Sequence, residues 1–320
     1  MLLEKINQKG KLSLNIVSII GIFICAFFIR LFYFDTELQL FNDENVYHYA
    51  GSNILEYGTL TSDRDGVINR GEAEAVPVST IQPGYPVFIA MIYGVFGENQ
   101  YLIRYANIII SLLTMFFIFK ITKALNLHRL VVGLILVLVT LYPGFNYNTA
   151  KILSEHLFTL LVIAHIYYFI VYLKEKNKKS LIMSITLISF ATYVRAHAFP
   201  LLIISLAFIV IYHNKNIKQV VKNISISLGI FVLVQLPWWI RNYIHFDQFI
   251  LFSNAGDNPK IWGALPYFIG IFEVDNQTLS NLLKSSINVD QILFVKWRIF
   301  GFFQYMWADV WDEYLVHPFQ

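Results

Sequence analysis

The chain has 320 residues, of which 57% are hydrophobic and 14% are charged, and its formal net charge is +3. Soluble domains contain about 25% charged residues, and a soluble domain of this length could not bury so much apolar surface. The composition therefore excludes a soluble globular protein and predicts a multi-pass α-helical membrane protein. The single cysteine, Cys25, excludes an intrachain disulfide and a cysteine metal site.

Apolar stretches along the chain are the candidates for membrane helices, which need about 20 residues or fewer when neighbours shield them. In chain order they cover residues 12–34, 101–123, 130–147, 152–173, 181–212 and 224–240. Lysines precede the first stretch, but no small-residue cleavage site follows it. We therefore predict an uncleaved first membrane helix instead of a signal peptide.

Basic residues gather in four clusters between these stretches. The clusters are Lys5, Lys9 and Lys11; Lys120, Lys123 and Arg129; Lys174, Lys176, Lys178 and Lys179; and Lys215, Lys218 and Lys222. The positive-inside bias places all four in the cytoplasm, together with the N-terminus. Two clusters flank residues 181–212, so this stretch must cross twice, as helices 181–196 and 197–212. The sequence thus predicts seven crossings up to residue 240.

The remaining segments are expected on the outer side of a cell membrane, either plasma or inner. Residues 83–96 are apolar but too short to cross, so we predict an interfacial helix within the outer loop 35–100. The outer segment 241–320 contains the apolar stretch 291–308, which is either an eighth crossing or another interfacial helix. The fold class predicted is all-α, a single membrane-embedded domain over residues 1–320 with seven or eight membrane helices.

Three carboxylates lie at the outer ends of predicted helices. Asp43 and Glu44 begin a stretch of helical periodicity in the outer loop. They either serve only as an acidic helix start, or they supply a general base and its neighbour. Glu155 falls in the first turn of an apolar helix, where ionisable groups are costly and usually line cavities. The alternative for Glu155 is an acid in interfacial water.

Two arginines on the predicted outer side run against the positive-inside bias. Arg195 lies between two apolar helices, which favours a guanidinium that binds a lipid phosphate. Arg241 follows Trp238 and Trp239, so it is either such a phosphate ligand or an anchor beside an aromatic belt. His48, His156 and His197 match no metal-binding spacing, and polar contacts within the protein are expected for them.

Motifs in a consistent order give the chain a resemblance to a known family. They are Asp43-Glu44 with Tyr47 and Ala50, Gln82-Pro83-Gly84-Tyr85-Pro86, Arg104 with Asn107, Leu153-Ser154-Glu155-His156-Leu157-Phe158, Ala191-Thr192-Tyr193-Val194-Arg195, Pro237-Trp238-Trp239-Ile240-Arg241-Asn242-Tyr243, and Phe252-Ser253-Asn254-Ala255-Gly256-Asp257-Asn258. The set resembles the GT-C superfamily of polyprenyl-phosphate-sugar glycosyltransferases, family 39-like, in the protein O-mannosyltransferase and aminoarabinose lipid A transferase branch. Some relatives have lysine where this chain has Gln82. Members usually continue with further membrane helices and often a soluble tail, so this chain is expected to be either a short member or a truncated product.

The resemblance implies an inverting transfer of a hexose or pentose from a polyprenyl-phosphate donor to a hydroxyl or amine of a glycan, lipid or protein. Asp43 is the expected base, and Glu44 and Glu155 are the expected groups that orient it or the acceptor. Arg195, Arg241 and Arg104 are expected at the donor phosphate. Acceptor or loop contacts are expected from Tyr47, Tyr85, His156, Asn242 and Asn254, with the loop 253–263 covering the site.

The same interpretation predicts the partners and cofactors of the chain. Membrane lipid is an expected partner and nucleic acid is not. No cofactor is required by the sequence, and a divalent metal is left open. The rival interpretation is a transporter or lipid flippase that uses Glu155 and Arg195 along its path, but the chain shows no related halves. A structural scaffold is a weaker alternative, because it gives no reason for arginines on the outer side.

Overall fold

The computed structural model describes residues 16–34, 40, 43–61, 77–213 and 215–253, and this part of the chain contains helices but no strand. The helices are α2 (Ile16–Phe32), α3 (Asp43–Tyr57), α4 (Gly84–Phe96), α5 (Gln100–Ala124), α6 (Arg129–Leu141), α7 (Pro143–Thr149), α8 (Glu155–Glu175), α9 (Lys178–Val194), the short 3-10 helix η1 (Ala196–Ala198), α10 (Phe199–Tyr212) and α11 (Ile217–Phe246). The predicted stretch 291–308 and Asn254 lie outside the described residues.

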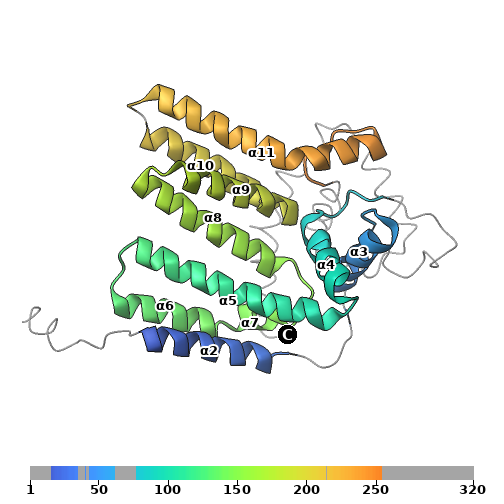
Figure 1. The fold of residues 1–320 in the computed structure, drawn as a ribbon, viewed down its shortest axis with the longest axis horizontal. Helices are drawn as coiled ribbons and strands as arrows, with labels where there is room; N and C mark the ends of the chain where they lie inside the picture. Colours follow the sequence, from blue (N-terminus) through green and yellow to red (C-terminus); the bar gives the residue numbers. More distant parts are fainter. Residues whose placement is uncertain (1–15, 35–39, 41–42, 62–76, 214, 254–320) are drawn as a thin grey trace, which may run out of the picture. The chain divides into compact units, whose positions relative to one another are not determined.

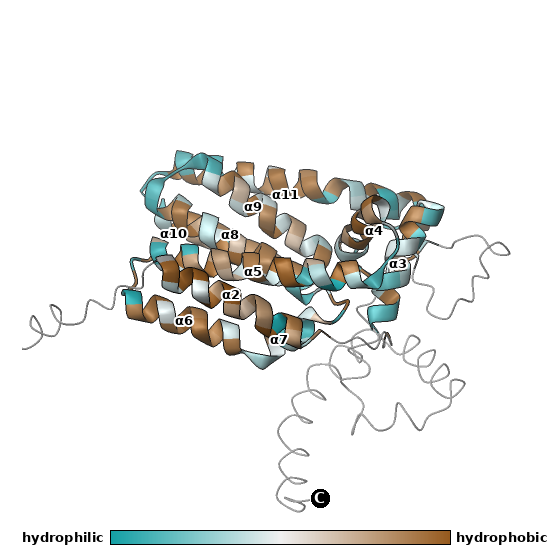
Figure 2. Ribbon diagram, turned by 60° about the horizontal axis from the view of Figure 1, so that its bottom comes forward, coloured by the Kyte–Doolittle hydropathy of each residue, from teal (hydrophilic) through white to brown (hydrophobic). Residues whose placement is uncertain are grey.

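The long apolar helices lie side by side as a bundle, whereas α3 and α4 sit together at one of its ends (Figure 1). Helix α8 packs against both α5 and α9, and α9 packs against α11. A core of large apolar side chains joins α8 to α11; its members include Phe169, Leu181, Ile188, Leu202 and Phe231. Brown, hydrophobic residues also cover the outward surfaces of these helices (Figure 2). An apolar exterior of this kind suits contact with lipid.

Three helices in the described part are long and apolar enough to cross a membrane, namely α5, α8 and α11. A fourth is added if α6 and α7, which are bent by 52° at their break, form one span. Helices α2 and α10 are apolar but shorter. The all-helical prediction is therefore confirmed for this part, whereas the prediction of seven or eight crossings stays a prediction.

Residues 130–147 do not form the single predicted helix, because the chain breaks at Tyr142 between α6 and α7. The cause is Pro143, since the residue before a proline is pushed out of the helical conformation. Tyr142 accordingly has φ −66° and ψ 111°, and Pro143 starts α7. The break turns α7 across the end of the bundle, where Lys151 follows it.

The stretch 181–212 contains most of α9 and all of α10, with η1 between them, and its two crossings of a membrane stay a prediction. Arg195 ends α9 in an extended conformation, with φ −150° and ψ 127°. Pro200 then lies in the first turn of α10, where its missing N–H costs nothing. The hairpin therefore places Arg195 at the same end of the bundle as α3 and α4.

Three of the four basic clusters gather at the opposite end, which we call the basic end, whereas Lys5, Lys9 and Lys11 lie outside the described residues. It is formed where α5 and α8 finish and α9 and α11 begin, near Lys123, Lys174, Lys179 and Lys218. In Figure 2 the teal, hydrophilic residues are likewise concentrated at the helix ends. The basic loops and helix α3, which carries Asp43 and Glu44, therefore lie at opposite ends of the bundle.

Helix α4 is fixed to the bundle by a close approach at Gly84. A Cβ atom there would lie 2.7 Å from the carbonyl carbon of Tyr193 and 2.8 Å from the nitrogen of Val194, so any side chain would force α4 away from α9. Gly51 similarly lets α3 approach α4, because its Cβ would lie 2.3 Å from Ile89 Cγ2. Through these two contacts, α3 is held on α4 and α4 on the end of α9.

Candidate active site

The first turn of α3 presents two carboxylates with opposite environments. Asp43 is exposed, whereas Glu44 is only 3% exposed. Both lie where the helix dipole favours negative charge. Asp43 is thus free to meet a ligand from outside, and Glu44 is directed into the protein.

Glu44 attaches α3 to the segment before α8. One of its oxygens, Oε1, accepts a hydrogen bond of 2.9 Å from the backbone nitrogen of Ile152, and Oε2 lies 3.7 Å from Lys151 Nζ. The same segment is held from α5, because Asn107 Nδ2 donates to the Lys151 carbonyl at 2.7 Å. A buried carboxylate with these partners acts as an anchor, so Glu44 positions Asp43.

A second connection joins α3, α8 and α9 one turn further along α3. Tyr47 and Ser154 share a hydrogen bond of 3.3 Å between their hydroxyls. Arg195 Nε donates to Ser154 Oγ at 2.8 Å, and Arg195 Nη2 donates to Glu155 Oε1 at 2.5 Å. Ser154 precedes α8 but does not cap it with its side chain, so its hydroxyl is available for these contacts.

Asp43, Glu155 and Arg195 all lie close enough to Tyr47 to affect the pKa of its hydroxyl. Burial is the main factor that raises the pKa of the Tyr47 hydroxyl. The carboxylates of Asp43 and Glu155 raise this pKa further, whereas the Ser154 hydrogen bond and the Arg195 charge lower it. The described residues thus bring Asp43, Glu155 and Arg195 around one tyrosine, although they come from three separate helices.

The Arg195–Glu155 pair is accessible, since the side chains are 32% and 36% exposed. Arg195 uses Nε and Nη2 within the site, and within the described residues Nη1 makes no hydrogen bond. A guanidinium held in this way can offer its remaining donors to an anion without changing its orientation.

An apolar groove begins beside this pair. It has a volume of about 590 Å³ and is lined from four helices, α4, α8, α9 and α11. Val194, which directly precedes Arg195, and Leu157, two residues after Glu155, lie on its wall, and Phe88, Met91 and Leu233 also line it. The charged pair and a hydrocarbon-like groove are therefore carried by the same ends of α8 and α9.

The hydrogen bonds of Arg241 go to Asn242 and to two backbone carbonyls. Arg241 Nη1 donates to the Val78 carbonyl at 2.8 Å and to Asn242 Oδ1 at 2.9 Å, and Nη2 donates to the Leu60 carbonyl at 3.3 Å. The guanidinium also lies over the Trp238 ring at 5.0 Å. These contacts hold the two ends of the segment between residues 60 and 78, so Arg241 has a structural task that the sequence did not reveal.

The other predicted contacts are buried. Tyr85 is fully buried and accepts from Asn107 Nδ2 at 3.4 Å, while its ring meets that of Tyr47 edge-on at 5.1 Å. Arg104 is buried close enough to Tyr93 to lower the pKa of that hydroxyl, which burial raises overall. His156 is buried against Phe145. Of these residues, Tyr85 contacts the site directly, through its ring against Tyr47.

Comparison with known proteins decides the family. A family model described as dolichyl-phosphate-mannose-protein mannosyltransferase matches residues 77–240, slightly more than half of the chain. The chain belongs to this family. No curated protein and no solved structure matches it. Membership makes the chain a membrane glycosyltransferase that uses a lipid-linked sugar donor.

The matched region of this mannosyltransferase family contains Ser154, Glu155 and Arg195 but not Asp43 or Glu44. Glu44 is nevertheless bonded to the matched region through the backbone nitrogen of Ile152, and Tyr47 on the same helix is bonded to Ser154. These two contacts connect α3, which also carries Asp43, to the matched region.

Lys151 and Ser154 are site residues that the sequence reasoning missed. Lys151 is a basic residue at the end of the bundle opposite the lysine clusters, and it departs from the predicted charge bias in the same way as Arg195 and Arg241. The role of Ser154 depends on contacts 41 and 107 residues away in the chain, and no local signal indicates them. Within the described residues, no group of three or more His, Cys, Asp or Glu could hold a metal ion.

Proposed function

We propose that the chain transfers a sugar from a polyprenyl phosphate to a hydroxyl or amine of a glycan, lipid or protein, with inversion at the anomeric carbon. The observation that carries this proposal is the convergence of Asp43, Glu155 and Arg195 around Tyr47, near an apolar groove. Such a site has a base, a phosphate ligand and a place for a lipid tail within one structure.

Each group has a definite task in the proposed reaction. The acceptor oxygen or nitrogen attacks the anomeric carbon, and the bond from that carbon to the phosphate oxygen breaks. Asp43 takes the acceptor proton, because it is more exposed than Glu44 and Glu155, and because Glu155 is paired with Arg195. Arg195 meets the charge that develops on the departing phosphate, with its fork already oriented by Ser154 and Glu155. Glu155 orients the acceptor.

The donor test uses the purified chain in liposomes with a radiolabelled polyprenyl-phosphate sugar such as the mannose form. We expect release of polyprenyl phosphate together with a labelled product or free sugar. A flippase or transporter would instead carry the intact lipid-linked sugar across the bilayer, leaving its glycosidic bond unbroken. Movement of donor without any release of polyprenyl phosphate would therefore contradict the proposed transfer.

The proposed membrane orientation has the N-terminus in the cytoplasm and the site at the outer face. It is supported by the separation of the basic end from α3 and α4. Exposed positions Glu56 and Asn177 lie at opposite ends of the bundle. In a Cys25→Ser background, we expect a membrane-impermeant thiol reagent to label Glu56→Cys in intact cells, and Asn177→Cys only after permeabilisation. The reverse pattern would overturn the orientation and the outer location of the site.

A further inference from the structure

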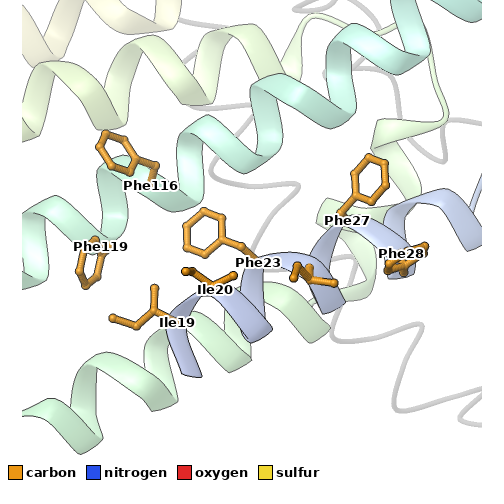
Figure 3. Close-up of a pocket in the computed structure, with 8 residues that line it drawn as sticks. Ile19, Ile20, Phe23, Phe27, Phe28, Phe116 and Phe119 are labelled. Carbon is orange, nitrogen blue, oxygen red and sulfur yellow. The ribbon is translucent and has the colours of Figure 1, made fainter. Parts of the chain in front are cut away.

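A second apolar groove lies on the other side of the bundle, away from the candidate active site. Its volume is about 490 Å³, and its lining consists entirely of Ile and Phe side chains from α2 and α5. Figure 3 shows Phe23 and Phe27 on α2 beside the groove, with Phe116 and Phe119 on α5 across from them. Neither wall offers a polar group to a ligand, so only a hydrocarbon suits its interior.

Cations mark one end of this groove. Lys120 Nζ lies 6.0 Å from the centre of the Phe116 ring, and Lys123 Nζ lies 5.6 Å from that of the Phe119 ring. These two rings line the groove, so both ammonium groups lie near its edge, in the last turns of α5, and Lys120 Nζ also lies 5.4 Å from the centre of the Tyr167 ring on α8. Lys174 adds a third ammonium through its hydrogen bond to the Ala124 carbonyl.

The sequence supplies little negative charge to balance these cations. No Asp or Glu occurs between Glu98 and Glu155, a stretch that includes all of α5, α6 and α7. The basic end therefore attracts an anion, and the adjoining groove attracts a hydrocarbon chain. Basic pockets between membrane helices are a recognised way to bind anionic lipid head groups.

The size of the groove distinguishes a lipid chain from a protein helix. A helix is about 10–12 Å wide with side chains and rises 5.4 Å per turn, so the groove volume equals roughly one helical turn. A membrane-spanning helix of about 20 residues has more than five turns. A narrow acyl chain fits this space, whereas a partner helix could place only a small part of its surface there.

We propose that the α2–α5 groove binds one acyl chain of an anionic phospholipid, whose phosphate is held by Lys120 and Lys123. This lipid is separate from the sugar donor, and its site does not depend on the proposed transfer reaction. It would fill the space between α2 and the rest of the bundle, and so fix α2 against α5.

The single cysteine provides the probe for a direct test. Cys25 is exposed and follows the groove residue Ile24. The full chain is labelled there with a fluorophore in phosphatidylcholine nanodiscs, and quenching is measured with phosphatidylglycerol or phosphatidylcholine that carries a spin label on its acyl chain. We expect the glycerol lipid to associate more tightly, by roughly five-fold for each lysine, which corresponds to about 1 kcal/mol per basic residue.

The double variant Lys120→Gln/Lys123→Gln should remove most of this preference. Its matched control, Lys215→Gln/Lys218→Gln, removes two exposed lysines elsewhere at the basic end and should retain it. Equal quenching by the two lipids in the unchanged protein would overturn the proposal, as would an unchanged preference in the first variant. Oxidative crosslinking between Cys25 of two copies, with no quenching by either lipid, would show that a second copy covers the groove and would also overturn it.

Discussion

Replacing Asp43 with asparagine should lower sugar transfer by about 100-fold or more, the usual scale for loss of a general base. Asparagine keeps the size and most hydrogen bonds of Asp43 but cannot accept the proton of the acceptor. Donor binding should remain, because the phosphate is held by Arg195 on α9. Turnover and donor affinity are measured separately, by release of polyprenyl phosphate and by equilibrium binding of the labelled donor.

Asp247→Asn is the matched control, because Asp247 is another exposed aspartate at the same end of the bundle as α3. It has φ 51°, a conformation that asparagine tolerates well, so its activity should be unchanged. If Asp43 only stabilised the start of α3, asparagine would replace it with little loss, since both residues serve helix starts well. Near-normal transfer by Asp43→Asn would thus exclude it as the base and make Glu155 the next candidate.

Replacing Arg195 with alanine should reduce transfer by roughly 100-fold or more and also weaken donor binding. Arg195 keeps Nη1 without a hydrogen bond within the described residues, and removal of one preorganised donor to a developing oxyanion costs about that much. Arg195→Lys should recover only part of the loss, because an ammonium cannot contact Ser154, Glu155 and a phosphate in the same forked geometry.

Arg241→Lys separates a phosphate contact from a structural one. Arg241 holds the carbonyls of Leu60 and Val78, so this change should lower thermal stability while leaving donor affinity nearly unchanged. A loss of donor affinity in Arg241→Lys as large as that in Arg195→Lys would show that Arg241 also binds the phosphate. Measuring the melting temperature and the donor dissociation constant for both variants distinguishes these outcomes.

The sequence predicted those parts of the fold that charge and hydropathy control. The lysine clusters required a hairpin within residues 181–212, and the structure breaks the helix at Arg195. The helical periodicity after Asn42 predicted α3, which starts at Asp43. Averaged hydropathy concealed the break at Tyr142, although Pro143 was a local signal for it.

The sequence indicated individual residues of the candidate site but not how they are arranged. Asp43, Glu155 and Arg195 each carried a local signal, as charged groups beside apolar helices. Their mutual geometry depends on contacts that no local pattern contains, such as the close approach at Gly84 and the hydroxyl of Ser154. For the same reason, nothing near Arg241 in the chain indicated that distant backbone carbonyls would occupy its donors.

The contacts of α3 also have a consequence for biosynthesis. Asp43 and Glu44 leave the ribosome well before Ile152, Ser154 and Arg195, on which their placement depends. At about 5–20 residues per second, the interval between Glu44 and Ile152 lasts roughly 5–22 s. During that time Glu44 lacks its contacts with Lys151 and Ile152, so α3 must wait in a hydrated environment. A nascent chain arrested before Lys151 emerges should therefore expose α3 to protease, whereas a chain released after α8 and α9 have inserted should protect it.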